Sequence, residues 1–334
     1  MNRMCWRWVV AGILAGQGAW ADVARIGATT YPTLPAAVAA AHSNDTIVLI
    51  GDPVLTQALP IAIPLTIVSD GAVRTISRTN AFADDLITVQ YPGSLTLGSP
   101  SGTDASPTLV LDGGSSAGIR GGYSFIFAYQ ASIVIHPGVL IRNYSATYAA
   151  LYLVDNGTLA SLTMHGGCFS NNAATNSHGG ALCSQGASLY LQNAVFTANA
   201  APRGRGGAIF LEYASLVASN LVIHGNSADD YGGGIVGLPA HMDLSGGRLS
   251  ANSAINGGGI ANASGRLSTD STRFESNHAF FGAALWSHSG SNVLRHSTFQ
   301  GNQSESFGGA CYSIASSFAL SNCQIVANSS ASYG

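Results

Sequence analysis

Seven short phrases that end in asparagine recur through the second half of this 334-residue chain. Successive asparagines are 25 to 27 residues apart. A constant period of this length, with short apolar runs between turns, is typical of one coil of a right-handed parallel β-helix. The repeated asparagines are Asn172, Asn199, Asn226, Asn252, Asn277, Asn302 and Asn328.

A glycine-rich phrase follows each of the first six asparagines. Glycine adopts the left-handed backbone that a tight turn needs, so these phrases predict the turn before each new strand. No helix is expected after them, which excludes a phosphate-binding loop. The repeat glycines include Gly179, Gly180, Gly206, Gly207, Gly233, Gly258, Gly308 and Gly309.

The residue three positions before each asparagine is Phe, Ile or Leu, and we call it the apolar phrase residue of its coil. We expect this residue to point inward and to stack on its equivalents in neighbouring coils, as for Phe169, Phe196, Phe274 and Phe299. The asparagine should lie at the next corner and bond to the equivalent asparagine one coil away, forming a ladder. Asn193, Asn220, Gly246 and Asn322 stand three residues before the apolar position and predict a left-handed corner between two sheets.

The first half is less regular but is expected to join the same solenoid. Residues 1–21 carry Arg3 and Arg7, a short apolar run and an Ala-Trp-Ala site, which predict a cleaved secretory signal peptide. Residues 31–42 form the one credible helix, expected to cap the N-terminal end. We therefore divide the chain into a signal peptide (1–21), irregular capped coils (22–164) and regular repeats (165–334). At about 26 residues per coil, the mature chain is expected to make about twelve coils. The strands expected in the irregular part are 46–50, 65–68, 86–89, 94–97, 108–111, 132–135, 139–141 and 151–154.

The composition limits the kinds of partner that the chain can bind. The chain has no lysine, 9% charged residues and a formal net charge of −3. Nucleic acid binding requires clustered basic residues, so it is excluded as the main activity. No apolar segment after the signal peptide is long enough to span a membrane as a helix.

The alternation of GGA[ILV] with FxxN resembles the passenger region of the chlamydial polymorphic outer membrane proteins, within the pectin-lyase-like β-helix superfamily. Residues 196–199 with 206–209, and 299–302 with 308–310, fit the motif best. The resemblance implies a secreted β-helical autotransporter passenger, an adhesin displayed at the outer membrane by a C-terminal β-barrel. No alternating strands of such a barrel follow the repeats in this sequence.

Many β-helices cleave polysaccharides, so a glycan-active lyase or hydrolase is the alternative. Such an enzyme needs several carboxylates on adjacent coils, with calcium and a basic residue in a lyase. Candidates are Asp229, Asp230, Asp243, Asp270, Glu212 and Glu275. Asp243, Asp270 and Glu275 lie at positions −6, −4 and +1 from the apolar phrase residue, and we expect them not to converge on one face. Catalytic residues, cofactors and bound metals are therefore expected to be absent.

The remaining polar candidates read as surface features. The histidines show no metal-ligand spacing and are expected at the surface or at corners: His165, His178, His224, His241, His278, His288 and His296. Arg203 and Arg205 flank Gly204 in a turn, where a solvated turn is favoured over an acidic-glycan site.

Four cysteines follow the signal peptide. Alignment of the repeats places Cys311 and Cys323 inward, and we expect both to be buried free thiols, with a disulfide as the alternative. Cys168 and Cys183 are expected to point outward.

The chain ends where the repeat predicts the start of another strand, at Ser332-Tyr333-Gly334. We therefore expect this sequence to be the N-terminal part of a longer protein, or of a gene interrupted downstream, and its open last coil to associate end to end or aggregate.

The sequence thus predicts an all-β, single right-handed parallel β-helix with a short capping helix. Its expected role is a secreted or surface-displayed passenger that binds a host-surface or envelope protein or glycan, or serves structurally. An outward column of aromatic and polar residues would favour binding, and three close carboxylates would favour the enzyme.

Overall fold

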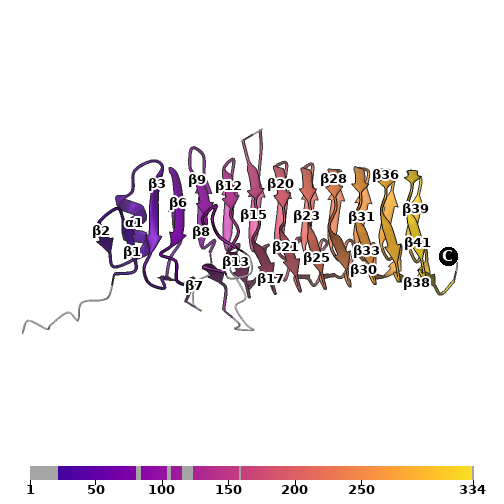
Figure 1. Ribbon diagram of the computed structural model, residues 1–334, viewed down its shortest axis with the longest axis horizontal. Coiled ribbons are helices and arrows are strands. Elements are labelled where there is room, and N and C mark those ends of the chain that lie inside the picture. Colours follow the sequence, from indigo (N-terminus) through magenta and orange to yellow (C-terminus); the bar gives the residue numbers. More distant parts are fainter. Residues whose placement is uncertain (1–21, 80–83, 104–106, 115–122, 158, 333–334) are drawn as a thin grey trace, which may run out of the picture.

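The computed structural model describes residues 22–79, 84–103, 107–114, 123–157 and 159–332. They form a parallel β-solenoid, a rod of stacked coils with one short helix (Figure 1). The expected signal peptide and the terminal Tyr333-Gly334 step lie outside these residues. No helix among the described residues is long and apolar enough to cross a membrane.

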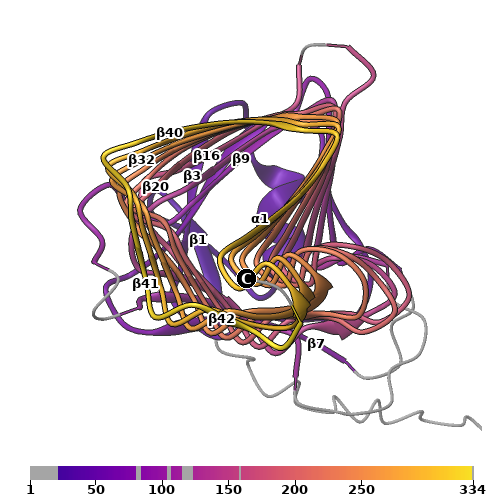
Figure 2. The same ribbon diagram turned by 90° about the vertical axis from the view of Figure 1, so that its right-hand side faces the viewer.

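Four sheets run along the rod, and each coil contributes one strand to each sheet it reaches (Figure 2). The parallel part of sheet A contains β3 (Asp45–Leu49), β6 (Pro64–Ser69), β9 (Ser94–Leu97), β12 (Ser132–Ile135), β16 (Ser161–Met164), β20 (Ser188–Gln192), β24 (Ser215–Ser219), β28 (His241–Ser245), β32 (Arg266–Asp270), β36 (Ser291–Arg295) and β40 (Ser317–Ser321). Sheet B contains β4 (Val54–Leu55), β7 (Arg74–Arg78), β10 (Leu109–Asp112), β13 (Val139–Arg142), β17 (Cys168–Ser170), β21 (Val195–Thr197), β25 (Val222–His224), β29 (Arg248–Ser250), β33 (Arg273–Glu275), β37 (Thr298–Gln300) and β41 (Gln324–Val326).

The other two sheets complete the coils. Sheet C contains β5 (Leu59–Ile61), β8 (Ile87–Gln90), β11 (Ile126–Tyr129), β15 (Leu151–Val154), β19 (Leu182–Gln185), β23 (Ile209–Glu212), β27 (Ile235–Leu238), β31 (Ile260–Ala263), β35 (Leu285–His288) and β39 (Cys311–Ile314). Sheet D, which begins later in the chain, contains β14 (Ser145–Ala146), β18 (Ala173–Ala174), β22 (Ala200–Ala201), β26 (Ser227–Ala228), β30 (Ser253–Asn256), β34 (His278–Phe281), β38 (Gln303–Phe307) and β42 (Ser329–Ser330).

The N-terminal end is capped, as expected. Helix α1 (Leu34–Ala40) begins after Thr33, whose hydroxyl accepts a hydrogen bond from the Ala36 amide at 3.2 Å. Its buried Leu34 and Ala37 pack into the core. The sequence did not predict two short strands, β1 (Ala24–Ile26) and β2 (Thr29–Tyr31). Strand β1 pairs antiparallel with the edge of β3, and β2 pairs antiparallel with β1. Because this cap consumes residues before β3, sheet B holds 11 strands, and the expected count of about twelve coils was slightly too high.

The interior is a column of aligned apolar side chains. Phe169 stacks on Phe196 with ring centroids 5.1 Å apart, and Phe274 stacks on Phe299 at 4.7 Å. All four are fully buried. Parallel in-register pairing places equivalent residues directly above one another, so the expected stacks are confirmed.

The predicted asparagine ladder is also present. Each side-chain amide donates to the Oδ1 of the asparagine in the next coil, at 2.8 to 3.0 Å from Asn172 through to Asn328. Each Nδ2 also donates to a carbonyl of a preceding coil, as Asn252 does to Ile223 at 3.0 Å. The ladder therefore satisfies backbone groups at the corner between sheets B and D that no strand pairing reaches.

Two backbone features explain the glycines of the repeat. Gly206 has φ +69°, in the left-handed region, where a side chain is strained. A Cβ on the following Gly207 would collide with the carbonyl oxygens of Gly233 and Ser227 in the next coil. The first glycine, Gly206, therefore allows the turn, and the second, Gly207, allows the coils to stack closely.

A second apolar cluster lies on the outer face of sheet C, and the sequence did not reveal it. Its buried members are Ala149, Cys183, Phe210, Val236, Ala261 and Trp286. Tyr231, Phe281 and Tyr312 pack against them as partly buried neighbours. These outward positions are thus shielded from water by segments that belong to the neighbouring side of the coil.

The cysteines correct two expectations. Cys183 points outward but is only 4% exposed, because it belongs to this outer cluster. Cys311, on β39, and Cys323, directly before β41, were expected to be buried but are half-buried, since no described strand covers β39 and β41 on the C-terminal side. Neither is bridged, so the expectation of free thiols is confirmed.

Burial should make the Cys183 thiol slow to react. Burial raises the pKa of Cys311 to about 12 and raises the pKa of Cys183 further, and only the thiolate is a good nucleophile. We expect iodoacetamide at pH 8 to alkylate Cys183 about a hundredfold more slowly in the native chain than in urea. Peptide mass spectrometry gives the rate at each position, and rapid native labelling of Cys183 would contradict the outer cluster.

Candidate binding groove

One outward column of sheet A is formed by the first residue of successive strands. Strand register aligns Ser188, Ser215, His241, Arg266 and Ser291 in a single row along the rod. Each lies eight residues before the apolar phrase residue of its coil, so a count at this offset would have found the row in the sequence. His241, Arg266 and Ser291 are exposed, and Ser215 is half-exposed.

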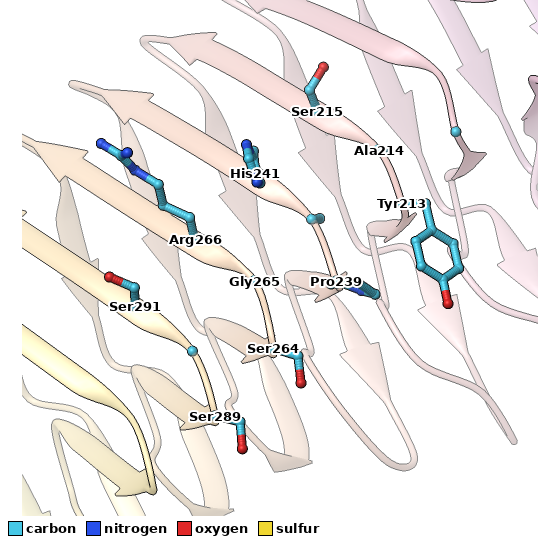
Figure 3. Close-up of a pocket in the computed structure, with 13 residues that line it drawn as sticks. Tyr213, Ala214, Ser215, Pro239, His241, Ser264, Gly265, Arg266, Ser289 and Ser291 are labelled. Atoms are coloured by element: carbon cyan, nitrogen blue, oxygen red, sulfur yellow. The ribbon is translucent and has the colours of Figure 1, made fainter. Parts of the chain in front are cut away.

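A groove of about 690 Å³ runs beside this column, across the coils. Figure 3 shows one row formed by Ser215, His241, Arg266 and Ser291 and a second row formed by Tyr213, Pro239, Ser264 and Ser289. Between the rows lie the small residues Ala214, Ala240, Gly265 and Gly290. The groove therefore repeats the same construction over four successive coils.

The corner between sheets C and A explains this shape. Tyr213, Ser264 and Ser289 have φ of 52°, 57° and 53°, so the chain turns sharply there and directs these side chains outward. The next residue must fit against the adjacent coil, and a Cβ on Gly265 would meet the Ala240 carbonyl oxygen. Small residues at the turn leave the groove open, while Tyr213, 74% exposed, stands at its edge.

The groove contains one guanidinium without an acidic partner. No ion pair joins Arg266 to any described carboxylate. Four other arginines do have such partners, in the pairs Arg74–Asp70, Arg142–Asp112, Arg205–Asp230 and Arg248–Glu275. Arg266 and the neighbouring His241 thus offer hydrogen-bond donors directly to the solvent in the groove.

A second hollow of about 550 Å³ lies at the other end of the sheet A strands. Tyr190, Val217, Asp243, Asp270 and His165 are among its lining residues. The expectation that Asp243 and Asp270 would not converge on one face was therefore wrong. Their offsets of −6 and −4 have the same parity, and side chains two residues apart in a strand share a face.

The two aspartates are neighbours but not directly opposed. Asp243 pairs with Ser268 and Asp270 with Ser245 on adjacent strands, so their Cα atoms are on the order of 7–8 Å apart. His296 lies 3.1 Å from Asp270 through Nδ1 and Oδ1. Hydrogen bonds from His296 and Ser271 hold the pKa of Asp270 below its usual value.

The other carboxylates lie away from both hollows. Asp230 pairs with Arg205 at 2.9 Å, beside the turn at Arg203. Glu275 pairs with Arg248 on sheet B at 2.6 Å. Glu212, on sheet C, accepts a hydrogen bond from Gln185 at 2.8 Å. No third carboxylate joins Asp243 and Asp270 in the second hollow.

Six of the seven histidines predicted to lie at the surface are exposed. His178 is the exception: it is half-buried, stacks on Phe210 with ring centroids 4.5 Å apart, and its Nδ1 accepts a hydrogen bond from the Arg205 amide. Burial and the nearby Arg205 charge lower the pKa of His178. In the described part of the chain, no three His, Cys, Asp or Glu side chains lie close enough to hold a metal ion.

Comparison with known proteins supports the motif resemblance. The model of the chlamydial polymorphic membrane protein repeat matches residues 296–314, which include one FxxN phrase and the following GGA phrase. No curated protein matches the sequence. A solved structure, the enzymatically active domain of tailspike protein 2 from bacteriophage CBA120, matches with 15% identity and a TM-score of 0.26. That match covers 82% of this chain, which spans 43% of the tailspike chain.

Proposed function

We propose that this chain is a secreted, surface-displayed passenger that binds an extended glycan along the sheet A groove without cleaving it. The observation that carries the proposal is the groove itself, which repeats the same two walls over four coils. The matching repeat of the chlamydial membrane protein family supports the placement at a bacterial surface.

The groove suits a hydroxyl-rich polymer that lies along the rod. Successive coils present their polar groups about every 4.8 Å. An extended peptide repeats its side chains on one face about every 6.6 Å, so it would match the coils poorly. Serine hydroxyls both donate and accept hydrogen bonds, as sugar hydroxyls do. The exposed ring of Tyr213 adds an apolar face with a polar tip.

The carboxylates favour binding over catalysis. A glycosidase needs a general acid with a raised pKa beside an ionised partner. His296 and Ser271 instead stabilise the ionised form of Asp270, which lowers its pKa. Asp270 thus lacks the raised pKa that the general acid of such a pair requires.

A glycan-active enzyme is the second candidate, and one observation favours it. Asp243 and Asp270 line the same hollow on adjacent strands. Their Cα atoms are about 7–8 Å apart, which allows the side chains to reach the carboxyl separation of an inverting hydrolase, about 6.5–9.5 Å. New reducing ends formed by the wild-type chain but not by Asp243→Asn would establish this activity and overturn the non-catalytic proposal.

Blocking the groove should abolish binding. Ser291 is exposed on β36, so Ser291→Trp places a large ring in the groove while the strand accepts an aromatic residue. On a glycan array, we expect the affinity for the glycans bound by the wild type to fall at least about tenfold. Gln300→Trp is the matched control, because Gln300 is exposed on β37 of sheet B, in the same coil but on another face. Equal binding by the two variants would exclude this groove as the site.

A further inference from the structure

We infer that the sheet A groove selects glycans that carry anionic groups, carboxylate or sulfate; this inference rests on the proposed function. The outward column of sheet A has serine at Ser188, Ser215, Ser291 and Ser317 but changes to His241 and Arg266 at its centre. Ser215, His241, Arg266 and Ser291 of this column line the groove. The site therefore has a cationic centre at Arg266, beside the hydrogen-bond donor of His241, between neutral hydroxyl-bearing coils.

Arg266 has the chemistry for this role. Its guanidinium carries five N–H donors in a fixed planar fork that matches the two oxygens of a carboxylate or sulfate group. It is exposed and makes no ion pair with a described residue, so a ligand does not have to displace a protein carboxylate. The adjacent His241 is also exposed, one coil away and about 4.8 Å along the rod.

The surrounding charges limit the preference for anionic groups to the position of Arg266. Asp243, the nearest acidic residue of the same face, lies diagonally across from Arg266, with Cα atoms about 7–8 Å apart. It lines the second hollow and not the groove. The whole chain has a net charge of −3, which repels polyanions in general. Binding of an anionic polymer therefore requires a defined cationic site.

The arrangement also predicts which groups of the polymer contact which residues of the groove. An anionic substituent would pair with Arg266 and His241, and flanking hydroxyls would bond to Ser215 and Ser291 on the coils at either side. The neutral contacts provide affinity for the polymer, and the cationic centre distinguishes charged from uncharged chains.

The test uses three polymers with one backbone: dextran, carboxymethyl dextran and dextran sulfate of equal length. We expect the wild-type chain to bind at least one anionic form about tenfold more tightly than dextran at low salt, with the difference shrinking as salt increases. Arg266→Gln should remove this difference between the anionic polymers and dextran. Arg273→Gln is the control, because Arg273 is exposed on β33 of sheet B without an ion pair to a described residue. Circular dichroism confirms that each variant is folded.

Three results would overturn the inference. Equal wild-type affinity for the three polymers would show that charge is not read, while leaving glycan binding itself supported. Equal loss in Arg266→Gln and Arg273→Gln would show general charge attraction and no selective site. Binding of none of the three polymers, together with no glycan lost in Ser291→Trp, would overturn both the inference and the proposed function. His241→Gln provides a second variant, expected to weaken the anionic preference partially.

Discussion

Replacing Asn252 with alanine should lower the free energy of unfolding by about 3–5 kcal/mol. Asn252 is fully buried at the middle of the ladder. Its Nδ2 donates to Ile223 and Asn277, and its Oδ1 accepts from the backbone and side-chain amides of Asn226. Alanine would leave several buried polar groups without partners, and each such group costs about 1–3 kcal/mol. The shift of the urea midpoint, followed by circular dichroism, measures the loss.

Asn220→Gly provides the control for this prediction. Asn220 is exposed, has φ 53°, and makes a side-chain bond to Asn193 at 3.2 Å. Glycine accepts that backbone conformation, so we expect a change of no more than about 0.5 kcal/mol. Similar midpoints for Asn252→Ala and Asn220→Gly would mean that the buried ladder contributes little to stability.

We propose that the mature chain, residues 22–334, forms dimers through its last coil when it is expressed alone. Among the described residues, strands β39, β40, β41 and β42 each have a neighbour on one side only. Leu320, Ile325 and Val326, at 45%, 54% and 51% exposure, are left open to water there. The opposite end is covered by α1, β1 and β2. Because only one end is open, association should stop at a tail-to-tail dimer with two-fold symmetry and should not continue into filaments.

Light scattering after size exclusion tests this proposal over a range of concentrations. We expect dimers to increase with concentration and Ile325→Lys to shift the chain to monomers, because the charge would be buried in the dimer. Val222→Lys, on a 36% exposed residue of β25 in the middle of the rod, should leave dimerisation unchanged. A wild-type monomer at all concentrations would contradict the proposal, and so would growth into long polymers.

The core of each coil was predictable because it is set by local periodicity. The offsets that place Phe196 inward and Asn199 at a corner recur in seven coils, so each copy tests the others. The outer cluster was not predictable from this pattern. Phe210 and Trp286 occupy outward positions, and their burial depends on Tyr231 and Phe281, which come from another side of the coil. No spacing rule within one strand indicates such a cover.

The candidate groove, too, could be predicted only in part from the sequence. Its column could be found by counting eight residues back from the phrase residue, but its depth could not. Depth depends on the sharp corner at Tyr213 and on the close packing at Gly265, both of which are properties of neighbouring coils. The shared face of Asp243 and Asp270 could have been predicted, because their offsets of −6 and −4 have the same parity and side chains two residues apart in a strand lie on one face.

The direction of the asparagine ladder gives the rod an electrical polarity. Every ladder bond runs the same way, from the Nδ2 of one coil to the Oδ1 of the following coil. The side-chain amide dipoles therefore add along the axis, and each bond polarises the next. The N–H ends point toward Asn328 and the oxygen ends toward Asn172, where Oδ1 accepts from the Tyr144 amide. The last coil thus presents a partial positive charge along the rod axis, and any group that docks there meets hydrogen-bond donors aligned by the whole stack.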